Sequence, residues 1–155
     1  MLVSPTFVYV FDRDSSLAIG NFTHPEYDVV TVDYNANDIP LTANTETADI
    51  VTVSDPREIT KGEISGLVYI VSTNNKDESV ILRFYGNTMG LMYETPPIHI
   101  PAESAGENAL ANYESTGTTI PAGEIISLRV ESTDNDLAIR GTITASQLRL
   151  VRRNL

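Results

Sequence analysis

The stretch from Pro121 to Glu131, PAGEIISLRVE, carries the clearest structural signal in the chain. Ile126, Leu128 and Val130 alternate with polar side chains, which is the period of a β-strand with one buried face. The proline that opens the stretch, with a glycine two residues later, favours a tight turn. This segment therefore predicts a turn that leads into a half-buried strand.

The same period of two recurs along most of the chain. Residues 137–144 and 147–150 alternate between apolar and polar side chains, and so do residues 80–85. Asn- and Asp-rich segments at 73–78 and 132–136 separate these runs, and both residue types suit turns because they tolerate left-handed backbone. About nine candidate strands result, which predicts an all-β sandwich or barrel.

Polar stretches interrupt the pattern. Residues 35–48 and 86–119 are expected to form long surface loops. The best helical candidate, Glu103–Tyr113 (ESAGENALANY), is short and is interrupted by a glycine, so it does not change the fold class.

One strand is apolar on both faces. The run Leu67–Val71, LVYIV, has no polar row. A strand of this kind is buried on both sides, either within its own domain or by a neighbouring chain. We expect Leu67–Val71 to be a central strand or to be covered by another chain.

The N-terminal segment is also apolar on both faces, with Phe7, Tyr9 and Phe11 on one face and valines on the other. Residues 1–20 are therefore expected to be either an assembly arm, which pairs with the sheet edge of another chain, or the first strand of the domain. Residues 21–155 form the main domain. Deletion of residues 1–20 is expected to leave a folded domain that attaches poorly if the segment is an arm.

Composition and charge exclude several classes of protein. The 155 residues suit one domain, and 41% of them are apolar. Ten basic residues against 21 acidic ones give a net charge of -11, which argues against nucleic acid and anionic membranes as partners. There is no cysteine, and hence no disulfide, thiol nucleophile or cysteine-based zinc site. The start of the chain lacks the basic region of a secretory signal.

The charge is unevenly distributed along the chain. Residues 1–56 carry nine acids and one base, whereas residues 129–155 carry five arginines and three acids. One interpretation is that the acidic and the basic residues lie on two separate faces that are exposed to solvent. The alternative is electrostatic complementarity, in which the acidic part of one copy meets the basic end of another.

No pattern of residues indicates catalysis, a cofactor or a metal. His24 and His99 are the only histidines, and neither has a companion at metal-ligand spacing. No nucleophile-elbow or phosphate-binding glycine motif occurs. Acidic pairs at 12/14 and 134/136 suit solvated turns, with a loop calcium site as the alternative.

Carbohydrate recognition needs exposed aromatic rings, and tryptophan is absent. Tyr85, Tyr93 and Tyr113 fall at or near one predicted end of the domain and are candidates for a sugar patch. Packing in the core or at its rim is the alternative explanation for all three.

Four segments of the second half follow one another in a familiar order: KGEISGLVYIVS (61–72), VILRFYGN (80–87), IPAGEIISLRV (120–130) and ASQLRLVR (145–152). This order of motifs resembles the C1q/TNF-like jelly-roll domain of bacteriophage virion proteins. Departures from the family pattern are Glu124 in place of aspartate, Ile64 in place of an aromatic residue, and Gly86–Asn87 in place of Asn-Gly.

The resemblance implies a jelly-roll β-sandwich of about eight to nine antiparallel strands that forms a homotrimer and has no catalytic residues. It implies a head decoration, cement or fibre protein that binds the major capsid protein, resides in the virion and is assembled in the host cytoplasm. A carbohydrate-binding or host-receptor-binding module on the same fold is the alternative function.

Overall fold

The computed structural model describes residues 6–10, 18–19, 27–34, 39–42, 45–47, 50–55, 57–72, 75–103, 106–133 and 139–153. Every regular element in these ranges is a β-strand, and none of them contains a helix that could cross a membrane. The twelve strands are β1 (Thr6–Val10), β2 (Ala18–Ile19), β3 (Tyr27–Tyr34), β4 (Ile39–Thr42), β5 (Val51–Ser54), β6 (Ile59–Ser72), β7 (Glu78–Gly86), β8 (Gly90–Glu94), β9 (Ile98–Ile100), β10 (Glu107–Ile120), β11 (Ile125–Ser132) and β12 (Ile139–Arg153).

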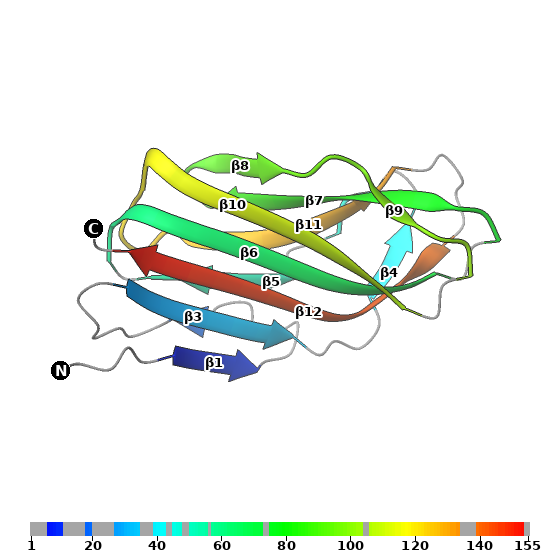
Figure 1. Ribbon diagram of the computed structural model, residues 1–155, viewed down its shortest axis with the longest axis horizontal. Coiled ribbons are helices and arrows are strands. Elements are labelled where there is room, and N and C mark those ends of the chain that lie inside the picture. Colours follow the sequence, from blue (N-terminus) through cyan, green and yellow to red (C-terminus); the bar gives the residue numbers. More distant parts are fainter. Residues whose placement is uncertain are drawn as a thin grey trace.

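The strands form two sheets that pack against each other (Figure 1). The first sheet has the order β1-β3-β12-β6-β10, and β4 also pairs with β12. The second has the order β2-β5-β11-β7-β8, and β9 also pairs with β7. Eight of these strands, β3-β12-β6-β10 and β5-β11-β7-β8, pair antiparallel with one another, whereas the edge strands β1 and β2 pair in parallel with β3 and β5. This arrangement confirms the predicted all-β jelly-roll sandwich of about eight to nine antiparallel strands.

The core lies between the two sheets, and its buried apolar side chains come mainly from the inward rows of β4 to β7 and β9 to β12. The stretch quoted first forms β11, and its Ile126, Leu128 and Val130 are fully buried, as predicted. Phe84 of β7 faces Gly66 of β6 so closely that a Cβ at this glycine would lie 2.9 Å from the ring. Burial of each such large apolar side chain contributes about 1.5–3 kcal/mol.

Residues 86–119 differ most from the sequence-based expectation. They contain β8, β9 and most of β10, in place of a long loop, and the helical candidate Glu103–Tyr113 lies largely in β10. The reason is an inverted pattern: the inward row of β10 holds the small residues Ala109 and Ala111, which are buried, while Leu110 points outward. The side chains of β10 therefore do alternate between the two faces, but the hydrophobicity of the sequence does not show this alternation.

The N-terminal strand β1 lies at the edge of the first sheet, parallel to β3, with Phe7 opposite Val30 and Tyr9 opposite Val32. Phe11 lies outside the described residues. An edge strand can belong to its own domain or pair with a neighbour, so the arm and the first strand both remain predictions.

Candidate interaction surface

The outer face of the first sheet carries large apolar side chains that the rest of the described chain leaves uncovered. Leu67 of β6 pairs directly with Leu110 of β10, and Tyr69 pairs with Asn108. Leu110 is 56% exposed and Tyr69 is 36% exposed, while Leu67 is half-buried. We call Leu67, Tyr69 and Leu110 the apolar face.

The apolar face bears on the prediction made for Leu67–Val71. This run lies in β6, which is central because β12 and β10 flank it on either side. Ile64, Val68 and Ile70 point into the core and are fully buried, but the alternate residues point outward. Burial within the chain therefore accounts for one row of this strand only. Contiguous exposed apolar side chains of this kind are typical of interaction surfaces.

Gly106, which directly precedes β10, leaves room for the side chain of Tyr69. A Cβ on this glycine would overlap the hydroxyl and ring of Tyr69. The ring therefore lies close against the backbone at the start of β10.

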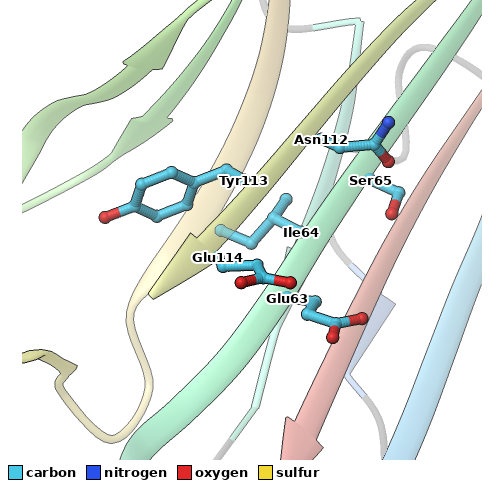
Figure 2. Close-up of a pocket in the computed structure, with 6 residues that line it drawn as sticks. All are labelled: Glu63, Ile64, Ser65, Asn112, Tyr113 and Glu114. Carbon is cyan, nitrogen blue, oxygen red and sulfur yellow. The ribbon is translucent and has the colours of Figure 1, made fainter. Parts of the chain in front are cut away.

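The apolar face is bordered by a polar depression of about 200 Å³ (Figure 2). Glu63 of β6 lies opposite Glu114 of β10, and Ser65 lies opposite Asn112. Figure 2 shows these four side chains along the two strands, while Tyr113 points away towards the other sheet. Like charges directly opposite each other repel across a strand pair. The depression is therefore an acidic margin to the apolar face.

A basic position lies near this margin on the next strand. Arg149 of β12 is exposed and pairs with Ser65 of β6, which is two residues from Glu63 on the same strand. The outer face of the first sheet thus combines an apolar centre with both signs of charge at its border. This composition is that of a protein interface with an apolar core and a polar rim.

The three tyrosines proposed as a sugar patch do not lie together. Tyr93 and Tyr113 stack with their ring centroids 5.6 Å apart, and Tyr93 stacks in turn on the buried Phe84 at 6.1 Å. Tyr85 belongs to the outward row of β7, where the Arg129 guanidinium lies 4.1 Å from its ring centroid. The structure therefore brings two of the three together, at the rim of the core, and places the third on the outer face.

The outer face of the second sheet is polar and internally paired. Arg83 donates hydrogen bonds to Glu46 at 2.6 Å, Glu131 at 2.5 Å and Glu94 at 2.7 Å. Arg129 donates a hydrogen bond to Glu46 at 3.2 Å. We call these five residues the charge cluster. The sequence placed Arg83 on an outward row but gave no signal for its partners, because they come from distant segments.

The cluster alters the acidity of Arg83 and of the neighbouring Tyr85. Burial lowers the pKa of Arg83, but the hydrogen bonds to Glu94, Glu131 and Glu46 outweigh that effect and raise the pKa overall. Burial, together with the charge and hydrogen bond of Glu46, raises the pKa of the Tyr85 hydroxyl. Both groups therefore keep their protons at neutral pH.

Replacing Arg83 by methionine should lower the free energy of unfolding by about 2 kcal/mol at pH 7, because three carboxylates would then face one another without their shared cation. Urea unfolding at pH 7 measures the change. The exposed Arg149→Met is the matched control, and an equal loss in both variants would contradict the role of the cluster.

Glu124 joins two turns at one end of the sandwich. Its carboxylate is buried and accepts hydrogen bonds from the backbone N–H groups of Thr88 and Met89, at 2.8 and 2.9 Å, and from the Thr88 hydroxyl. Asn87 also bonds to Ile125 in both directions, through its backbone N–H and its side-chain oxygen. The β7–β8 turn is thereby attached to the turn before β11.

The described residues contain no cluster of metal-ligating side chains. His99 lies 3.6 Å from Asp77, and both side chains are 65% exposed. In the ranges that the structure describes, no three His, Cys, Asp or Glu side chains converge as metal ligands. His24 and the acidic pairs at 12/14 and 134/136 lie outside those ranges, so the loop calcium site remains untested.

No family model matches the sequence, and no curated relative matches it. Among solved structures, a chain of the T13 IBDV (infectious bursal disease virus) particle is similar, with a TM-score of 0.52 and 12% identity over 83% of this chain and 31% of that chain. Eiger TNF from S. frugiperda is similar with a TM-score of 0.50 and 8% identity, over 81% of this chain and 93% of that chain. This chain spans about a third of the viral chain. These likenesses establish a jelly-roll fold of the viral and TNF type.

Proposed function

We propose that the chain is a non-enzymatic structural protein of a bacteriophage particle, a capsid decoration, cement or head-fibre module that works as a homotrimer. The fold supports this proposal at the level of architecture, because the similar structures include a virus particle and a TNF protein. The finer function rests on the resemblance of the strand and turn motifs to phage virion proteins and on the apolar face.

The apolar face is the single observation that carries the proposal of self-association. Leu110 and Tyr69 are the kind of side chains that a monomer rarely leaves exposed side by side, and a second copy of the chain would cover them. The mixed charges at the border suit a contact between identical chains, because each copy supplies both signs. In a closed ring of three copies, each copy would bury its own apolar face against a neighbour.

Attachment to a capsid would stabilise the particle by linkage. A protein that binds the assembled coat and not its free subunits shifts the equilibrium towards assembly. We propose that the partner is the major capsid protein, and that the trimer bridges neighbouring coat subunits. The rings of Tyr85, Tyr93 and Tyr113 all have partners within the chain, so sugar binding has no specific structural support.

Light scattering on the purified protein tests the proposal. A particle of about 51 kDa, three times the 16.9 kDa of one chain, is expected, and it should co-sediment with capsids but not with free coat subunits. A stable monomer would contradict the trimer. A trimer that binds a glycan array in preference to capsids would favour the receptor-binding alternative.

A further inference from the structure

The two sheets end differently on the side where β8 and β10 lie. In the second sheet, β8 has only five residues, its pairing with β7 shifts register, and Pro96 and Pro97 follow before β9. Between these strands, Thr95 bonds to both backbone groups of Leu82, through its own N–H and its hydroxyl. Short strands, bulges and prolines are the devices by which natural sheets prevent strand addition.

The edge formed by β10 has none of these devices along most of its length. β10 pairs with β6 in one unbroken register from Glu107 to Thr116, and its register shift falls only between Thr116 and Ile120. The strand contains no proline and no basic residue. A long, straight edge of this kind is a template for an additional strand from another chain.

The charges on β10 restrict what can occupy this edge. Its only charged residues are Glu107 and Glu114, so pairing of two β10 strands would place four glutamates in one strand pair with no basic residue among them. The strand β1, TFVYV, carries no charge and consists of residues with high β-propensity. Pairing of β1 with β10 therefore avoids the repulsion that self-pairing of β10 would meet.

The position of β1 in its own chain makes such an exchange possible. β1 is a five-residue edge strand held in parallel register by β3, and parallel pairing is slightly the weaker kind. Because β1 lies at the edge, its exchange would remove no interior strand from the first sheet.

We propose that the β10 edge of one copy binds β1 of the next copy, so that each subunit of the assembly receives one strand and donates one. This inference rests on the proposed self-association and names a second contact within it, distinct from the apolar face. Such a head-to-tail contact uses two different surfaces, and three copies in a closed ring satisfy all of them.

Cysteine cross-linking tests the contact, because the natural chain has no cysteine. Five variants, each with one cysteine at a position from Thr6 to Val10, are mixed in turn with Asn112→Cys and oxidised. Since each chain has a single thiol, every mixed disulfide joins two copies, and mass spectrometry identifies it. We expect mixed disulfides at alternate positions of β1, because successive residues of a strand point to opposite faces.

The control is Ser65→Cys, which lies directly opposite Asn112 but on the inner neighbour β6. A strand added at the edge would lie about 10 Å from β6, beyond the limit of about 7 Å between Cα atoms for a disulfide. The inference is overturned if Ser65→Cys reacts as well as Asn112→Cys, or if no mixed disulfide forms while light scattering still shows a trimer. A monomer in light scattering would instead contradict the proposed self-association itself.

Discussion

Replacing Glu124 by alanine should lower the free energy of unfolding by about 3 kcal/mol, one of the largest effects expected of any single substitution in this chain. The carboxylate is buried and is the acceptor for the backbone N–H groups of Thr88 and Met89 and for the Thr88 hydroxyl. Alanine would leave the two backbone donors without this acceptor and would free the β7–β8 turn from β11. Urea unfolding at pH 7 measures the loss.

The same carboxylate should make stability depend on acid. Burial raises the pKa of Glu124, but the hydrogen bonds from Thr88 and Met89 outweigh it and hold the pKa below its ordinary value of 4.5. A carboxyl group that is more acidic in the folded state stabilises the fold above its unfolded pKa, and this contribution is lost as the pH falls through the folded pKa. The difference in stability between the natural protein and Glu124→Gln should therefore be largest at pH 7 and shrink as the pH falls through the folded-state pKa of Glu124.

Glu114→Ala is the matched control, because it makes the same substitution at an exposed glutamate, within β10. It should change the free energy of unfolding by no more than about 0.5 kcal/mol. If Glu124→Ala and Glu114→Ala behave alike, the two turns do not depend on the buried carboxylate.

The Glu124 contacts also explain two departures from the family pattern. The resemblance has aspartate at position 124 and Asn-Gly where this chain has Gly86–Asn87. A Cβ at Gly86 would overlap the Glu124 carboxylate, so the glycine leaves room for the longer acid. Asn87, displaced by one position, bonds to Ile125 instead. Each departure is visible in the sequence, but their relation depends on two turns that only the fold brings together.

The fold was predictable wherever one face of a strand is apolar and the other polar. β7 and β11 have this pattern, and their inward rows are buried as expected. β10 was missed because the space between the sheets at its edge position takes alanines, which leaves its leucine outside. The rule that apolar residues point inward fails for a strand whose outer face is itself suited to a contact.

The candidate surface was predictable in part for the same reason. A run apolar on both faces, Leu67–Val71, indicated a strand with two buried sides. The sequence could not pair Leu67 with Leu110, because that contact depends on the register of β6 with β10, over forty residues apart. The charge cluster around Arg83 was unpredictable on similar grounds, since Glu46, Glu94 and Glu131 come from three different segments.

Replacing Leu110 by aspartate should dissociate the proposed trimer while leaving the subunit folded. The side chain is 56% exposed in the single chain, so the substitution should change the free energy of unfolding of the monomer by no more than about 0.5 kcal/mol. In an interface, by contrast, an unpaired buried carboxylate costs about 3–5 kcal/mol. That cost corresponds to a loss of at least a hundredfold in affinity at each contact. Light scattering should then give 16.9 kDa in place of about 51 kDa.

Leu91→Asp is the control that shows whether dissociation depends on where the new charge is placed. Leu91 is 52% exposed and lies on β8 in the second sheet, so the control makes the same substitution at nearly the same exposure, away from the apolar face. Circular dichroism should give matching folded-state spectra for both variants, and only Leu110→Asp should lower the mass. If Leu91→Asp dissociates the trimer and Leu110→Asp does not, the subunit contact lies on the second sheet. Mixed cysteine variants of β1 and β10 should lose their disulfides only where the trimer is lost, because strand exchange needs the subunits to be held together first.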